Sequence, residues 1–221
     1  MINDLKLGYR SLRYTYNLKG NITSAALMFG LGILISLFSS INTYMGSFFI
    51  MIAGMMPVQM IYSLNITGLV LSSPVRKRMQ TRIPTVCSLV SILGIYLFLA
   101  VMKVLCAWVN PEMQSYYCKD LVAAAVFGAA MMLYMGIAFK YFWISTILFF
   151  TGFILISDVI ERVLYSNGGI WSQGVVSFAI AILLGIAILA AAAFLSYLLS
   201  LALYKKTVSK RSQNANLQKY M

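Results

Sequence analysis

The sequence predicts an all-α integral membrane protein with six transmembrane helices, and the composition and the length of the apolar runs support this. Of its 221 residues, 61% are hydrophobic and 10% are charged, with a mean hydropathy of +0.86. A soluble domain carries roughly 25% charged residues. This chain therefore cannot cover itself with a water-compatible surface. Apolar runs of about 20 residues, enough for a helix to cross a ~30 Å hydrocarbon core, recur along it.

The six runs define a transmembrane domain over residues 22–204. They are Thr23–Ser40, Phe48–Leu71, Thr85–Trp108, Leu121–Phe139, Tyr141–Ser157 and Val175–Tyr204. Only Lys140 separates the fourth run from the fifth, so we expect one tight turn there. The sixth run is too long for one perpendicular crossing, so we expect it to tilt or to begin outside the lipid core.

The distribution of charge predicts that both chain ends lie in the cytoplasm. With that topology the outside retains only Lys103, Lys119 and Arg162 of the 17 Lys and Arg residues, as the positive-inside rule requires. The basic tail, residues 205–221, then lies inside. The net charge of +12 is accounted for by topology and by attraction to anionic lipid headgroups, and not by nucleic-acid binding. We expect a bacterial cytoplasmic membrane and multiple passes.

Residues 1–21 predict an amphipathic helix that lies in the membrane interface. The apolar stripe at helical spacing is Ile2, Leu5, Tyr9, Leu12 and Tyr16, and the basic neighbours are Lys6, Arg10 and Arg13. We expect the apolar side to face lipid and the cations to face headgroups. Asn3 or Asp4 is suited to cap its start, and Gly20-Asn21 to break into the first span. A solvated leader with accidental periodicity is the alternative.

The stretch "LSSPVRKRMQTRIPT" between the second and third spans predicts a short cytoplasmic helix over residues 73–84. Ser72 or Ser73 is a good N-cap, Pro74 suits the first helical position, and Pro84 disfavours helix just before it. An apolar stripe inside a collar of cations is typical of a docking element. The residues expected to dock are Ser73, Pro74, Val75, Arg76, Lys77, Arg78, Met79, Arg82 and Ile83. A plain basic loop that satisfies the positive-inside rule is the alternative.

Polar residues inside the spans are few. None of the six spans has an ionisable residue near its centre, and we expect Lys103, towards the outer end of the third span, to snorkel. This argues against ion-coupled transport, which normally needs intramembrane carboxylates or bases. Gln59, Ser63 and Thr67 share one face of the second span; they either line a pathway or form hydrogen bonds between helices.

The sequence offers no candidate for catalysis or for metal binding. It has no histidine, and Cys87, Cys106 and Cys118 lack metal-ligand spacing. A Cys106–Cys118 bridge and isolated thiols both remain open. An intramembrane hydrolase and a nucleotide-binding site are not expected, because the chain has no convincing carboxylate pair and no P-loop. The segment 157–174 alternates charged and apolar residues, which fits either a short helix that dips into the outer interface or a surface loop.

This arrangement resembles the permease subunits of ABC-2-type (type V) ABC exporters. The likeness rests on the amphipathic N-terminal helix, six spans with both ends inside, the helix at 73–84, and a re-entrant-like segment at 157–174. It implies that residues 73–84 are the coupling helix, which docks on a separate ATPase, and that residues 2–19 are the connecting helix. The small size is most similar to bacterial peptide exporters, such as those of phenol-soluble modulins, and to lantibiotic-immunity permeases.

From the resemblance we expect a non-catalytic subunit that forms a pathway for amphipathic or hydrophobic cargo, most often peptides. Its implied partners are two ATPase copies, a second permease (the same chain or a sibling) and membrane lipids, with ATP and Mg bound only by the ATPase. The alternative from another class is the vitamin-capturing membrane component of an energy-coupling-factor importer. That protein would need a polar pocket facing outward, for which the sequence supplies few residues.

Overall fold

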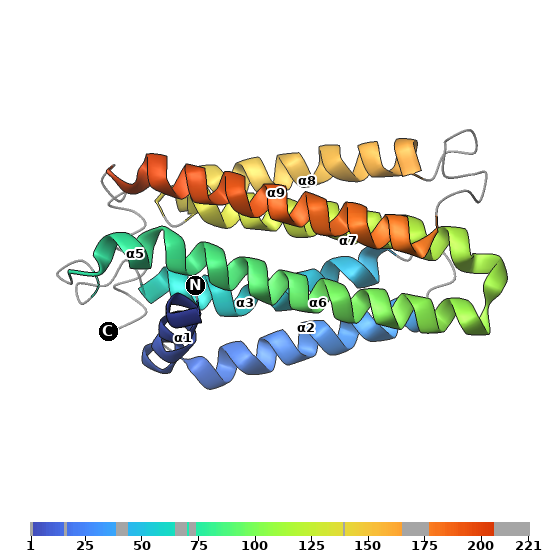
Figure 1. Ribbon diagram of the computed structural model, residues 1–221, viewed down its shortest axis with the longest axis horizontal. Coiled ribbons are helices and arrows are strands. Elements are labelled where there is room, and N and C mark those ends of the chain that lie inside the picture. The colour runs from blue at the N-terminus through green and yellow to red at the C-terminus, as the bar shows by residue number, and fades with distance from the viewer. Residues whose placement is uncertain are drawn as a thin grey trace.

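The computed structural model describes residues 2–15, 17–38, 44–64, 70, 74–138, 140–164 and 177–205. Within these ranges the chain is helical and contains no strand. The long helices run side by side along one common axis, and α1 lies across one end of the bundle (Figure 1). We call this the α1 end, and the opposite end the η2 end. In chain order the elements are α1 (Ile2–Ser11), η1 (Leu12–Tyr14), α2 (Leu18–Phe38), α3 (Tyr44–Leu64), α5 (Arg76–Gln80), α6 (Arg82–Val109), η2 (Pro111–Met113), α7 (Gln114–Ala138), α8 (Phe142–Leu164) and α9 (Phe178–Tyr204).

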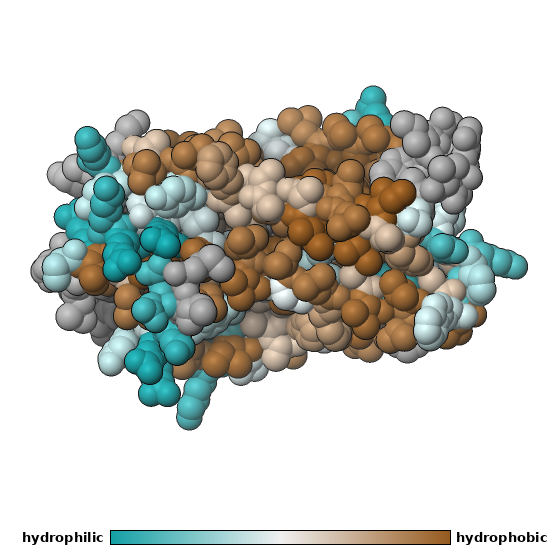
Figure 2. Space-filling view, in the orientation of Figure 1, coloured by the Kyte–Doolittle hydropathy of each residue, from teal (hydrophilic) through white to brown (hydrophobic). Residues whose placement is uncertain are grey.

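Among the described residues, five helical stretches are long and apolar enough to cross a membrane, so the prediction of a multi-pass helical membrane protein is confirmed at that level. They are Leu18–Leu37, Tyr44–Leu64, Arg76–Val109, Pro111–Ala138 and Phe178–Tyr204. Large aliphatic side chains lie exposed along α2, α6, α8 and α9. Figure 2 shows an apolar band across the middle of the face in view. In water such a surface would cause association, whereas lipid is a suitable solvent for it.

The helices extend beyond most of the predicted spans because an apolar run marks only the part at lipid depth. For example, α7 begins at Gln114 where the predicted span begins at Leu121. Likewise α8 continues to Leu164, past the predicted end at Ser157. Residues 157–164 are therefore the last turns of α8, and the separate short helix predicted there is wrong up to Leu164. The rest of the predicted segment, 165–174, lies outside the described residues.

Two turns between helices test specific predictions. The tight turn at Lys140 is confirmed: its amide and that of Tyr141 both donate to the Ile137 carbonyl, each at 3.1 Å. The predicted break at Gly20-Asn21 is wrong, since both residues lie inside α2. The chain turns instead at Asn17, whose φ is 50°. Asparagine is one of the few residues that tolerates this left-handed conformation.

The core lies among α3, α6, α7 and α9, with Ile50, Met51, Ile92, Leu99 and Met132 at its centre. Small residues bring helices close where bulky ones would separate them. Gly32 of α2 and Gly46 of α3 face one another, so that a Cβ on Gly32 would lie 2.8 Å from the Gly46 carbonyl oxygen. A Cβ on Gly136 of α7 would lie 3.0 Å from the Ser196 hydroxyl of α9.

Candidate functional site

The α1 end carries a basic surface built from α1 and α5. Figure 2 shows hydrophilic residues gathered there, in contrast to the apolar band. Lys77 of α5 is exposed, the Arg78 side chain of α5 is 62% exposed, and the Arg82 side chain at the start of α6 is 49% exposed. Lys6 and Arg10 of α1 are exposed as well, and so is Arg13 of η1. These exposed cations therefore lie at one end of the molecule, where they are accessible to an anionic partner.

The predicted docking helix is shorter than expected and only part of its stripe is exposed. The α5 helix covers Arg76–Gln80, with Val75 in the N-cap position. Pro74 lies in the turn before it, and Ser73 lies outside the described residues. The prediction that Pro84 ends this helix is wrong: Pro84 sits in the first turn of α6, where its missing N–H costs no hydrogen bond.

The apolar stripe of this segment consists of Val75, Met79 and Ile83, and two of these three residues pack inwards. Met79 is 6% exposed and Ile83 is fully buried, whereas Val75 is 38% exposed. Met79 and Ile83 form a small cluster with Ile61 and Cys87, against which Leu5 of α1 and Leu12 of η1 pack. The stripe therefore holds α5 and α1 on the bundle, and what remains for a partner is Val75 with the basic side chains.

Helix α1 packs on the protein through a face shifted by one residue from the predicted stripe. Its buried positions are Asp4 and Gly8, with Leu5 half-buried, while Tyr9 is 37% exposed. Thr15, directly after η1, is buried on the same side. The absence of a Cβ at Gly8 leaves room for the Cys87 thiol of α6. The Tyr9 hydroxyl lies 2.7 Å from that of Ser91. Tyr16 and the Ile2 side chain lie outside the described atoms.

Asp4 explains the shifted face. Its side chain is 7% exposed, and one carboxylate oxygen lies 3.1 Å from Arg82 Nε while the other lies 3.8 Å from Arg78 Nη2. The prediction of Asp4 as a helix cap gave it the wrong role, because the carboxylate instead neutralises two cations of the adjoining segment. This contact, together with the apolar cluster, makes α1, α5 and the start of α6 one packed unit.

Lys140 is a further cation at the α1 end, and it is buried. Its Nζ donates to the Tyr204 carbonyl at 3.1 Å, so the turn between α7 and α8 binds the last turn of α9, where a cation is favourable. Burial, and to a smaller extent the positive charge of Arg76, lowers the pKa of Lys140 below its ordinary value. The sequence identified Lys140 only as a turn residue.

Two of the three predicted pathway residues, Gln59 and Ser63, lie in the described part of α3. Gln59 is exposed on the outer surface of α3. The Ser63 hydroxyl donates to the Met60 carbonyl of its own helix at 2.8 Å. Thr67 lies outside the described residues. Ser63 is thus bonded within its own helix, and the pathway role of these residues stays a prediction.

The η2 end contains a buried polar cluster that sequence reasoning missed. It consists of Ser36 of α2, Ser47 of α3, Lys103 of α6 and Asp120 of α7. Lys103 Nζ lies 2.6 Å from Asp120 Oδ2 and donates to Ser36 Oγ at 2.6 Å. Ser47 Oγ donates to the same carboxylate at 2.8 Å. Both charged side chains are completely buried, so the prediction that Lys103 snorkels to the surface is wrong.

A sequence signal for this pair existed. Lys103 lies six residues before the end of α6 at Val109, and Asp120 lies six residues after the start of α7 at Gln114. At 1.5 Å per residue both are about 9 Å from the turn of one helical hairpin. Opposite charges at equal depth on two neighbouring antiparallel helices are placed to meet, and a buried charge requires a partner.

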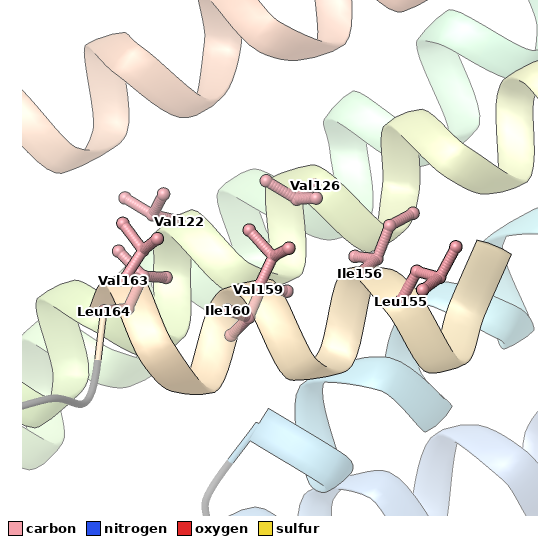
Figure 3. A pocket seen from close by; sticks show the side chains of 8 residues that line it. All are labelled: Val122, Val126, Leu155, Ile156, Val159, Ile160, Val163 and Leu164. Carbon is pink, nitrogen blue, oxygen red and sulfur yellow. The ribbon is translucent and has the colours of Figure 1, made fainter.

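An apolar groove lies between α7 and α8 towards the η2 end, with a volume of about 350 Å³. Figure 3 shows its aliphatic lining, with Leu155, Val159 and Val163 on α8 and Val122 and Val126 on α7 among the residues that point into it. These three α8 residues are more than half exposed. The groove is suited to hydrocarbon and supplies no hydrogen-bonding side chain to a polar ligand.

The described residues show no metal-binding group of three or more His, Cys, Asp or Glu side chains. All three cysteines are free thiols, with Cys87 and Cys118 buried, so of the two possibilities for Cys106 and Cys118 the structure has isolated thiols. Comparison with models of known protein families, with curated proteins and with solved structures found no match.

Proposed function

We propose that this chain is the transmembrane permease subunit of an ATP-driven ABC-2-type exporter. The observation that carries the proposal is the short cationic helix α5. It leads after one residue into α6, a helix that runs the length of the bundle (Figure 1). Its exposed cations suit an acidic groove on a separate ATPase, and its buried apolar side fixes it to α6. A push on α5 is then transmitted to a membrane-spanning helix.

The proposed topology has six spans with α1 and the end of α9 in the cytoplasm. Helix α8, at 23 residues and roughly 34 Å, takes the role of the fifth span. The α1 end holds the basic surface and the buried Lys140, and the positive-inside rule assigns such an end to the cytoplasm. The cell membrane in question is the bacterial cytoplasmic membrane.

Two such permeases, identical or sibling, form the pathway, and two ATPase subunits that bind ATP and Mg attach below. We assign an amphipathic or hydrophobic cargo of the peptide class, because the groove between α7 and α8 is lined by aliphatic side chains. The charges of Lys103 and Asp120 cancel within their pair and leave no net charge to select an ionic cargo. The permease itself is not an enzyme.

The test is copurification from the native membrane followed by an ATPase assay. We expect an ATPase to copurify and its hydrolysis to be stimulated by the permease. The variant Arg76→Glu/Lys77→Glu/Arg78→Glu should lose the ATPase while inserting normally. A matched control, Lys205→Glu/Lys206→Glu/Lys210→Glu, makes the same change in charge in the tail and should retain it. A chain that never recruits an ATPase refutes the proposal.

An ion-coupled carrier is the second candidate, and the Lys103–Asp120 pair favours it. The sequence argued against this class because it identified no buried ionisable group within a span, and the structure supplies two. Intramembrane carboxylates and lysines are the groups through which carriers bind and release protons. Cargo movement in ATPase-free liposomes, driven by a proton or sodium gradient, would select this function over the first.

A further inference from the structure

We propose that the buried cluster of Ser36, Ser47, Lys103 and Asp120 is a latch that holds the η2 end of the helical bundle closed. Its four members come from four helices, α2, α3, α6 and α7, and each is near the η2 end of its helix. Lys103 is the hub on one side, since it contacts both Asp120 and Ser36. Asp120 is the hub on the other, since it contacts both Lys103 and Ser47. One ion pair therefore ties four helices together.

The strength of this ion pair depends on the exclusion of water from the cluster. Charge attraction is strong in the low-dielectric interior and weak in water, where each charge is solvated separately. While the helices are packed, the pair resists separation; once water enters, little force draws it together again. A contact with this property favours two discrete states, fully closed and fully open, over a gradual range.

The stability of the fold does not require a charged pair at this position. Burying two charges costs desolvation energy, and well-packed apolar residues of similar volume are as stabilising or more so. What the pair adds is directionality, because it holds only in one register of the four helices. Asp120 Oδ1, moreover, is buried without a hydrogen-bond partner among the described residues. It can gain a partner when water enters, which favours the open state.

Helix α6 connects this latch to the α1 end. It runs from Arg82 to Val109, and its only proline lies in its first turn. Arg82 is paired with Asp4 at one end, and Lys103 is paired with Asp120 about 30 Å further along the helix axis. A displacement of α5 and the start of α6 therefore pulls on Lys103. This last step rests on the proposed function; the existence of the latch does not.

The test measures access of a water-soluble reagent to a site beyond the latch. Ala124 of α7 is fully buried and lies one turn deeper than Asp120. The parent chain carries Ala124→Cys, with its native cysteines replaced (Cys87→Ala, Cys106→Ser, Cys118→Ala). It is placed in lipid nanodiscs, where both ends are accessible, and treated with a hydrophilic maleimide. Labelling then follows the population of the open state.

The decisive variant is Lys103→Met/Asp120→Leu in this parent. It removes both charges together, so it keeps the packing and leaves no unpaired ion. We expect a labelling rate about tenfold faster than in the parent, with a thermal midpoint at or above the parent's. Met and Leu stabilise the packed fold as well as the ion pair does, but they do not hold the four helices in one register. The matched control Asp158→Asn/Arg162→Gln removes an exposed ion pair of 3.0 Å on α8 and should label at the parental rate.

Labelling of the folded double variant at the parental rate would overturn the latch and leave the pair a purely structural contact. If the double variant does not fold, Ser47→Ala replaces it: this change removes one arm of the tie, and unchanged labelling overturns the proposal in the same way. Neither measurement involves an ATPase. Faster labelling without ATPase recruitment would refute the exporter and retain the latch, and the reverse outcome would retain the exporter alone.

Discussion

The contact between α2 and α3 at Gly32 and Gly46 gives the sharpest prediction about stability. A Cβ on Gly32 would lie 2.8 Å from the Gly46 carbonyl oxygen and 2.9 Å from the Ile50 amide nitrogen, both backbone atoms. Ordinary contacts of a Cβ begin at 3.4 Å, so Gly32→Ala must push the two helices apart by roughly 0.6 Å. The Ile50 side chain, whose Cγ1 would lie 2.6 Å away, can rotate, but the two backbone atoms cannot move aside in this way.

The control is two residues away in the same helix. A Cβ on Gly30 meets nothing within 4 Å, so Gly30→Ala brings only the gain that alanine has over glycine in a helix, about 0.4–1 kcal/mol. That gain is common to both variants and cancels in their difference. What remains is the cost of overpacking at Gly32, about 1–3 kcal/mol.

The assay is thermal unfolding of both variants and the wild type in one detergent. With roughly 2–4 °C per kcal/mol for a chain of this length, Gly32→Ala should melt about 2–12 °C below Gly30→Ala. The wild type should melt between the two. A Gly32→Ala variant that melts at or above Gly30→Ala would refute close backbone packing of α2 on α3.

Three further predictions concern single side chains. Asp4→Asn should weaken the packing of α1 by about 1 kcal/mol, because its partner Arg82 is half exposed and screened; faster hydrogen exchange confined to α1 would show it. Tyr96→Phe removes a bond of 3.2 Å to the Ala181 carbonyl and should lower the free energy of unfolding by about 0.5–1.5 kcal/mol, with no change from a matched exposed position, Tyr14→Phe. The lowered pKa of Lys140 means that the unfolded chain binds more protons between that value and the ordinary 10.5. Stability should therefore rise with pH in that window, and Lys140→Met should abolish the rise.

The helical secondary structure and the approximate membrane-spanning segments could be predicted from the sequence, because both depend on local chemistry. An apolar run of about 20 residues has few options other than a helix in lipid. The turn at Lys140 followed for the same reason, since the combined run before and after it was too long for one crossing. These conclusions required no knowledge of which helix packs on which.

The packing face of α1 could not be predicted in the same way. The prediction placed Tyr9 on the packing face and left out Gly8, because it ranked each side chain by its own hydropathy. The actual face is chosen by the partner: the Cys87 thiol needs the space that a glycine leaves, and Arg82 needs a carboxylate at Asp4. Burial of a residue that is not apolar is decided by tertiary contacts, which the periodicity of one helix does not contain.

Lys103 shows the same limit with a larger functional consequence. A lysine near the end of an isolated span extends its amine to the headgroups. In the folded chain Asp120 lies at equal depth on the next helix, and an ion pair competes with the headgroups for that amine. The carboxylate wins because Ser36 and Ser47 each add a hydrogen bond to the pair. The number of polar partners available to the amine, and not the depth of Lys103 in the membrane, therefore decides where its side chain lies.

The two candidate functions place opposite demands on the ends of α6, and this separates them. An ATP-driven exporter needs the cations of α5 for transport. Loss of its latch would make the η2 end leaky but would not stop transport. An ion-coupled carrier needs Lys103 and Asp120 for every transport cycle, and its α5 cations can be reversed with no loss beyond topology. Transport abolished by the Arg76→Glu/Lys77→Glu/Arg78→Glu variant but retained by Lys103→Met/Asp120→Leu therefore identifies the exporter, and the opposite pattern identifies the carrier.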